Sequence, residues 1–164
     1  MMLRHWSSAA VIALAMAVSA PAFAVEKTED FIKKTAAANL FEVEHAKIAV
    51  DKAVSPAVKE LARKIVADHT KARADLEATV KAANLAYTPA QLENAQLKKI
   101  DELMKANVAE LEKDFLKVQK DAHQDVVGMF KDYAKDGENA QMKAWAAKML
   151  PDLEARLAEV DKLD

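Results

Sequence analysis

Beyond residue 24 the chain has three histidines, His45, His69 and His123, each on or beside the apolar face of a predicted helix. Glu42 precedes His45 by three residues, which gives the Glu-x-x-His spacing that some helical bundles use to hold metal ions. Imidazole and carboxylate groups are ligands for transition metals. The sequence therefore offers Glu42, His69 and His123 as candidate metal ligands, with His45 as a further candidate.

The Glu-x-x-His spacing occurs only once, whereas a di-iron carboxylate site uses it on two helices. Val66 stands three residues before His69, and Lys120 stands three residues before His123. Neither histidine therefore supplies the second copy. The alternative interpretation is that these histidines are hydrogen-bonded within the core and bind no metal.

The expected heights of these residues along a helical bundle support a common layer. If the first two helices form a hairpin that turns near residue 54, Glu42 and His69 differ in height by about 3 Å, and His45 and His69 by about 7 Å. His123 lies about 20 Å from the next predicted tight turn, and His69 is nearly as far from its own. We therefore expect all of these side chains near the middle of the bundle.

The residues that are missing exclude most other chemistries. The chain contains no Cys, so thiol catalysis, iron–sulfur clusters and c-type haem attachment are excluded. Beyond residue 24 the only Ser is Ser55, whose position before a proline fits a helix cap. The two glycines cannot form a phosphate-binding loop, which argues against a nucleotide. We assign no catalytic and no cofactor-binding residues, and the only cofactor we consider is one transition-metal ion.

Charges of both signs are interleaved along the whole chain, whose net charge is −2 with neutral histidines. Lys and Arg do not gather in a block, so a nucleic-acid partner is not expected. A protein partner or a homo-oligomer is compatible with the sequence, although no residue points to either.

The first 24 residues are typical of a cleavable export signal. Arg4 and His5 precede an apolar run over residues 9–18, and Ala22-Phe23-Ala24 supplies the small residues that precede cleavage. The apolar run is too short for a permanent transmembrane helix. We expect residues 25–164 to form one exported domain, periplasmic or secreted.

Helix-forming residues dominate this domain, and Pro and Gly fall where helices start, stop or bend. Ser55 and Pro56 predict a helix start, and Thr88-Pro89-Ala90-Gln91 resembles a capping box. Gly137 predicts a left-handed helix end, and Pro151 predicts a kink. The expected helices cover about 28–53, 56–83, 88–105, 107–135 and 139–162.

Four long helices and one shorter connecting helix predict an all-α, ferritin-like four-helix bundle. The connecting segment would span roughly 25 Å as helix, enough to cross much of the bundle length. An up-down-up-down bundle is the alternative topology.

Four segments in order, FIKKTAAANLFEVEHAKIAVDKA, VKELARKIVADHTKARADL, DFLKVQKDAHQDVVGMFKDYAKDG and MKAWAAKMLPDLEARL, resemble an exported bacterial family. This is domain of unknown function 4142, often labelled a predicted outer-membrane protein. The resemblance is most specific at Asp68-His69, at His123 and at Leu150-Pro151. It implies a ferritin-like bundle without an established activity, in which Glu42, Asp68, His69 and His123 match residues that the family tends to carry.

The chain departs from this family at Arg156, where the family often has a histidine after the Leu-Pro step. Arginine stays protonated and does not ligate metals. The departure implies that a ligand is lost, that His45 replaces it, or that Arg156 pairs with Glu42 in a purely structural layer.

These observations favour a non-enzymatic exported protein that binds a partner or acts in envelope stress. The alternative is a metal-binding protein or metal-dependent oxidoreductase with a His/Glu site in the middle of the bundle. Met142 and Met149 beside Trp145 suggest a thioether site for copper(I), although their helical spacing is more typical of core packing. Binding of an amphipathic helix to a membrane surface is a weaker alternative, because the polar faces are not basic.

Overall fold

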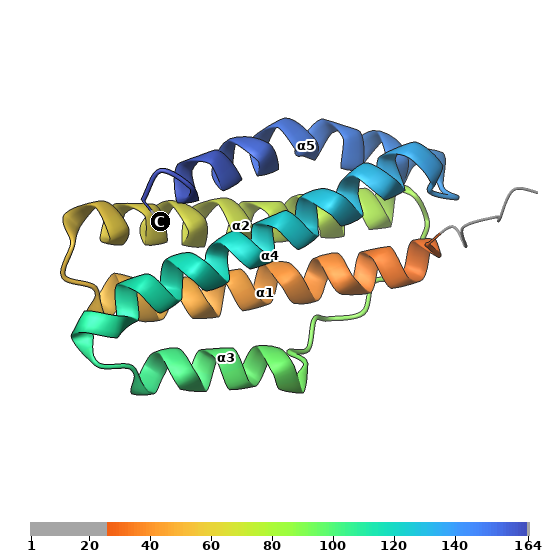
Figure 1. Ribbon diagram of the computed structural model, residues 1–164. Helices are drawn as coiled ribbons and strands as arrows, with labels where there is room; N and C mark the ends of the chain where they lie inside the picture. The colour runs from red at the N-terminus through yellow and green to blue at the C-terminus, as the bar shows by residue number, and fades with distance from the viewer. Residues whose placement is uncertain (1–25, 164) are drawn as a thin grey trace, which may run out of the picture.

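The computed structural model describes residues 26–163, which form five helices and no strand. The helices are α1 (Thr28–Lys52), α2 (Pro56–Ala82), α3 (Asn94–Lys105), α4 (Val108–Asp136) and α5 (Ala140–Val160) (Figure 1). The predicted signal, residues 1–24, and its cleavage point before Val25 lie outside the described residues. Among residues 26–163, no helix combines the length and the hydropathy that crossing a membrane requires.

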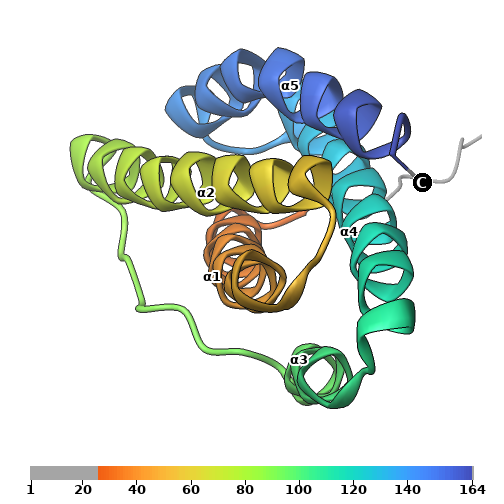
Figure 2. The same ribbon diagram turned by 90° about the vertical axis from the view of Figure 1, so that its left-hand side faces the viewer.

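The bundle consists of two antiparallel hairpins, α1 with α2 and α4 with α5, joined by a connection that returns along its length. Figure 1 shows that α2 and α4 run in the same direction, so the chain must travel back between them, and α3 makes this return. Viewed along the bundle in Figure 2, α3 lies outside the other helices, and it packs against α1 and α4. This is the long crossover of a ferritin-like fold, and the predicted four-helix bundle with a shorter connecting helix is confirmed.

Local capping interactions set several helix ends where the sequence predicts them. The Ser55 side chain caps α2 by accepting a hydrogen bond from the Val58 backbone N–H, and Pro56 occupies the first turn. The Asn107 side chain caps α4 by accepting from the Glu110 N–H at 3.0 Å, so α3 and α4 are separate helices rather than one bent helix.

The predicted start of the connecting helix at Thr88 is wrong, because α3 begins only after Glu93. The side chains of Glu93 and Gln96 form a reciprocal capping box there. Residues 85–93 instead follow an extended path in which Leu85, Tyr87 and Ala90 pack against the core. These three side chains are partly buried against the second apolar cluster, so packing at a distance outweighs the local capping signal.

The predicted left-handed conformation of Gly137 is also wrong, since its φ is −56° and its ψ is 148°. The residue in the left-handed region is Asn84, with φ 54°, which ends α2 in a Schellman motif. Its signature is the hydrogen bond from the Leu85 N–H to the Val80 carbonyl. Gly137 is required for a different reason, because a Cβ atom there would approach the Tyr133 ring and carbonyl to within 2.6–2.7 Å.

Two apolar clusters fill the bundle, one towards each end. The first is centred on Leu61, Ile65 and Phe115, and the second on Phe31 and Phe130. Met142 and Trp145 belong to the second cluster, as the core-packing interpretation of their spacing predicts, and Met149 packs against it. α5 continues through Pro151 as one helix. The middle of the bundle, between the clusters, is polar.

We predict opposite effects when the two glycines are replaced by alanine. Gly137→Ala forces a side chain into the Tyr133 ring and should lower the free energy of unfolding by about 1–3 kcal/mol. Gly128→Ala lies inside α4 with open space around the new methyl group and should raise it by about 0.5–1 kcal/mol. Thermal denaturation of both variants measures this contrast. Equal shifts in melting temperature would contradict the prediction, because they would show that contact with Tyr133 does not destabilise Gly137→Ala.

Candidate functional site

Side chains from α1, α2 and α4 form a buried polar layer between the two apolar clusters. Every side chain of this layer is less than 7% exposed. Besides the three histidines, the layer contains two amides and one carboxyl group. The layer consists of Asn39, Glu42, His45, His69, Gln119 and His123. The structure thus brings all four predicted site residues to the same level of the bundle.

His69 is held by an amide of the neighbouring helix. Its Nδ1 atom lies 2.9 Å from the Asn39 Oδ1 atom, and because an amide oxygen can only accept, Nδ1 carries the proton. The second ring nitrogen, Nε2, is therefore the one with a free lone pair. Burial, together with the nearby His123, lowers the pKa of His69 to about 3, so the ring is neutral at physiological pH.

His123 has the same protonation pattern, fixed by its own helix. Its Nδ1 atom donates to the Gln119 backbone carbonyl at 2.9 Å, which leaves Nε2 as a lone pair that is buried and has no partner. Burial lowers the pKa of His123, although the hydrogen bond to the Gln119 backbone opposes this shift. Its ring centroid lies 5.4 Å from that of His69, with the rings nearly perpendicular.

His45 has the opposite tautomer and faces different neighbours. The Gln119 side-chain amide donates to His45 Nδ1 over 3.2 Å, so the proton of His45 is on Nε2, which is buried without a partner. The ring stacks against Phe41 and Phe115. Burial lowers the pKa of His45 to about 4. This ring offers no free lone pair to the space between His69 and His123.

Glu42 lies beside His123, on the side of the ring that is already hydrogen-bonded. Its Oε1 atom is 3.9 Å from His123 Nδ1, and its Oε2 atom has no partner. Burial raises the pKa of Glu42 to about 8, with the Gln119 side chain opposing the shift. The carboxyl group is therefore largely protonated at pH 7.

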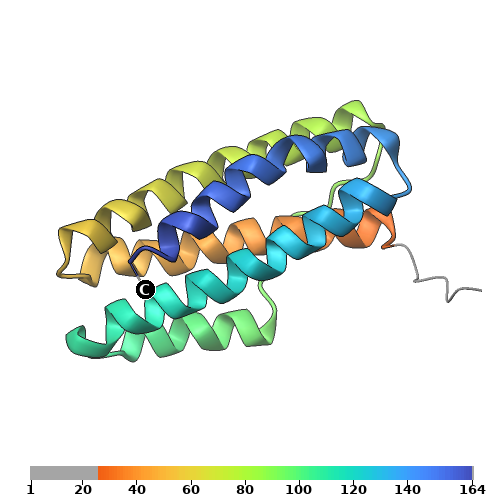
Figure 3. The ribbon, with the colours of Figure 1, turned by 45° about the horizontal axis from the view of Figure 1, so that its top comes forward.

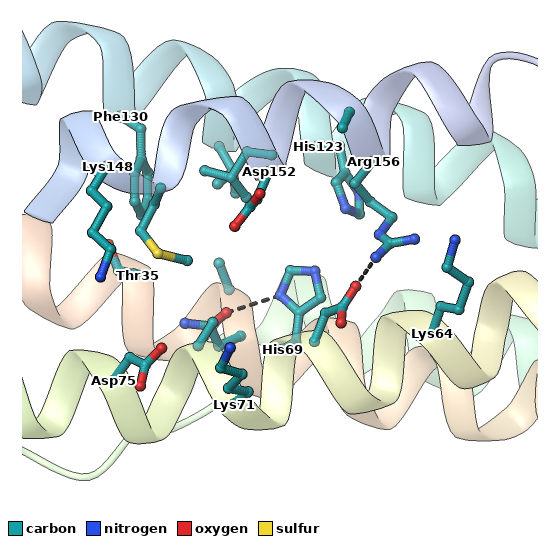
Figure 4. A pocket seen from close by; sticks show the side chains of 18 of the residues that line it. Thr35, Lys64, His69, Lys71, Asp75, His123, Phe130, Lys148, Asp152 and Arg156 are labelled. Atoms are coloured by element: carbon teal, nitrogen blue, oxygen red, sulfur yellow. Dashed lines mark hydrogen bonds and ion pairs between the residues drawn. The ribbon is translucent and has the colours of Figure 1, made fainter.

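His69 and His123 form part of the floor of a cleft between α2 and α5, with a volume of about 840 Å³. Figures 1 and 3 show α5 lying alongside α2, and the two helices touch less closely than the helices of either hairpin. Figure 4 shows both imidazole rings pointing into the cleft from opposite sides. The Met149 side chain also lines it.

An ion-pair network joins α2 to α5 beside the histidines. Arg156 pairs with Asp68 of α2 and with Glu159 of its own helix, and Lys64 of α2 also pairs with Glu159 (Figure 4 shows the first contact). The alternative that Arg156 pairs with Glu42 is wrong, because Asp68 is the acidic group that Arg156 reaches across the cleft. The network alternates in sign and carries no net charge.

Within residues 26–163, the side chains of His, Cys, Asp and Glu do not assemble into a group of three or more that could hold a metal ion. His69 and His123 are instead two neighbouring imidazoles whose ring centroids lie 5.4 Å apart. Their two Nε2 atoms are available, while fixed acceptors hold both Nδ1–H groups, as in the second shell of metal-binding histidines.

Sequence reasoning missed the two amide residues that orient the rings. Asn39 stands three residues before Glu42, and Gln119 stands four residues before His123, so each shares a helix face with a predicted site residue. The Asn39 and Gln119 side chains bond His69 and His45 of neighbouring helices, so this spacing does not by itself identify their partners.

The fold and its buried histidine layer define an all-α protein of the ferritin-like bundle type. The chain belongs to the family of domain of unknown function 4142 (DUF4142), whose sequence profile matches residues 13–163. Among solved structures it is similar to CopM in the Cu(I)-bound form, with a TM-score of 0.67 and 19% identity over 82% of this chain and 92% of that chain. At this identity the likeness shows the fold alone. No curated protein matches the chain.

We predict that Glu42→Gln changes the pH dependence of stability. The Glu42 pKa is raised in the folded state, so its favourable contribution is complete below about pH 4.5 and is lost as the pH rises towards about 8. The free energy of unfolding of Glu42→Gln relative to the unmodified protein should therefore increase from pH 5 to about pH 8, by at most about 1.4 kcal/mol per pH unit, and its relative melting temperature should rise with it.

Thermal melts across this pH range test the prediction. The histidines have lowered pKa values and lose their contribution as the pH falls below 6.5, but they are shared by both proteins. Glu44→Gln, on the same helix and paired with Lys47, is the control for removing a surface carboxylate. A difference between Glu42→Gln and the unmodified protein that does not vary with pH would contradict the prediction.

Proposed function

We propose that this protein is an exported, non-enzymatic metal-binding protein that holds one transition-metal ion between the Nε2 atoms of His69 and His123. The observation that carries the proposal is the matched protonation of the two rings. Each Nδ1–H group donates to a fixed oxygen, so each ring offers its Nε2 lone pair, and that of His123 is buried without a partner. An unsatisfied buried acceptor costs about 1–3 kcal/mol, a cost that a bound cation removes.

The position of the two rings also suits metal binding. Both are neutral at physiological pH, which is the state that ligates metals, so no proton has to be displaced from Nε2. Both residues line the cleft between α2 and α5. The ferritin-like likeness to CopM, which is described in a Cu(I)-bound form, supports a role in metal binding for a bundle of this shape.

The residues near the site give no support to an enzymatic role. The chain has no Cys, and Ser55 is used as the cap at the start of α2, whereas His69 lies in the middle of that helix. Protein docking in the cleft without a metal is the second candidate function, favoured by a lining that carries both signs of charge.

We expect about one transition-metal ion per chain in untagged protein purified from the exported fraction. His69→Ala and His123→Ala should each lose it, because a single imidazole cannot retain the ion. His45→Ala is the matched control, since it removes a buried histidine of the opposite tautomer from the same layer and should keep the ion. Elemental mass spectrometry gives the metal content, and circular dichroism shows that the helical fold is retained.

Two results would contradict metal binding. One is protein without metal that also fails to take up added Cu(I), Ag(I), Zn(II) or Ni(II). The other is equal metal content in His69→Ala and the unmodified protein. If His69→Ala only lowers the melting temperature, the histidines are core residues, and partner capture by the cleft becomes the function to pursue.

Export is tested by the mass of the protein. Because Ala22-Phe23-Ala24 provides the small residues that precede signal cleavage, the exported protein should begin at Val25. Intact-mass measurement of the periplasmic or secreted fraction checks this, and a full-length chain confined to the cytoplasm would contradict it.

A further inference from the structure

The ligand atoms of the histidine site are all neutral and polarisable. We propose that the site selects a soft monovalent cation, Cu(I) or its analogue Ag(I), over the divalent ions Zn²⁺ and Cu²⁺. This inference rests on the proposed metal-binding function and specifies the class of ion.

The charges around the two imidazole rings favour a monovalent ion. The partners of the two Nδ1–H groups are the side-chain oxygen of Asn39 and a backbone carbonyl, so neither ring is backed by a carboxylate. The carboxyl group of Glu42 lies 3.9 Å from Nδ1 of His123, the nitrogen that already donates to the Gln119 carbonyl. Asp68 is engaged by Arg156, which cancels its charge. Asp75 and Asp152 also line the cleft, but both are exposed to solvent, and no carboxylate of the described residues is hydrogen-bonded to either ring.

The cost of an uncompensated buried charge grows with the square of that charge. In the simplest solvation treatment, a divalent ion pays about four times the desolvation free energy of a monovalent ion of the same size. His69 is 6% exposed and His123 is 1% exposed, so water can repay little of this cost. The site consequently penalises Zn²⁺ and Cu²⁺ far more than Cu(I) or Ag(I).

The number and type of the available ligands favour Cu(I) or Ag(I) as well. The described residues provide two imidazoles and no third His, Cys, Asp or Glu for the same ion. Zinc in structural sites is almost always four-coordinate, whereas Cu(I) and Ag(I) accept two ligands. Met149, which packs against the second apolar cluster, also lines this cleft, and a thioether is the ligand type that selects Cu(I) over harder ions. Ligand number and ligand softness thus favour the same ions as the charge.

The selectivity can be measured by competition with Ag(I), which needs no reducing agent. The mature, untagged protein is dialysed against equal concentrations of Ag(I) and Zn²⁺, and separately of Ag(I) and Cu²⁺, and the retained ions are counted by native mass spectrometry. We expect one Ag(I) per chain, bound about 100-fold or more tightly than either divalent ion. His69→Ala should lose this ion, whereas His45→Ala should keep it.

Other outcomes separate failure of the selectivity from failure of the function. Retention of Zn²⁺ or Cu²⁺ in preference to Ag(I), lost in His69→Ala, would overturn the selectivity and leave metal binding intact. Retention of Ag(I) by His69→Ala would place the ion elsewhere and overturn both proposals, as would no binding of any ion.

A charge-introducing variant tests the physical cause. Asn39→Asp puts a carboxylate on the Nδ1–H of His69, which supplies negative charge and makes the ring a stronger ligand. The preference for Ag(I) over Zn²⁺ should then narrow by about tenfold or more. Asn84→Asp adds the same charge at the exposed end of α2 and should leave the preference unchanged. A folded Asn39→Asp protein with unaltered selectivity would overturn the charge argument.

Discussion

The hydrogen bonds that Asn39 and Gln119 make with the buried imidazoles are the interactions on which the chemistry of this bundle depends. An imidazole has two nitrogens and, when neutral, one proton, so fixing one nitrogen fixes the role of the other. The Asn39 side chain and the Gln119 carbonyl place protons on Nδ1 of His69 and His123. The Gln119 side chain does the reverse at His45. Gln119 thus fixes opposite tautomers in two histidines, with the proton on Nδ1 of His123 and on Nε2 of His45.

The polar layer is compatible with a stable bundle because apolar clusters close it off on both sides. Its members are buried, and several polar atoms lack partners, including Glu42 Oε2 and His123 Nε2. Such atoms are costly, and proteins keep them mainly where they serve a purpose other than stability. The cleft between α2 and α5 opens onto this layer, where these two helices pack less closely than the helices of either hairpin.

The fold could be predicted largely from the sequence because its signals are local. Ser55 and Asn107 cap helices through their own neighbours, and the apolar spacing identifies the buried faces. The failures concern long-range packing. The capping box at Thr88 gives way because the residues around it pack against the core. Gly137 is required by the Tyr133 ring rather than by its own backbone angle.

The level of the site was predictable from helix geometry, but its composition was not. Adding residue heights places Glu42, His69 and His123 in one layer. Which nitrogen faces the cleft, and whether Arg156 pairs with Glu42 or Asp68, depends on rotation about the helix axes and on side-chain conformation. A hydropathy pattern contains no information on helix rotation at this precision or on side-chain conformation. Asn39 and Gln119 were missed for the same reason, because the sequence does not show which side chain of another helix an amide on an apolar face will bond.

The distribution of the two imidazoles between the hairpins has a consequence for folding. His69 belongs to the hairpin of α1 and α2, and His123 to that of α4 and α5. Each hairpin is built from contacts close in sequence and can form early, whereas the docking of one on the other closes a much longer loop. The pair of Nε2 atoms therefore exists only after docking, so a partly folded chain with one hairpin formed has half a site.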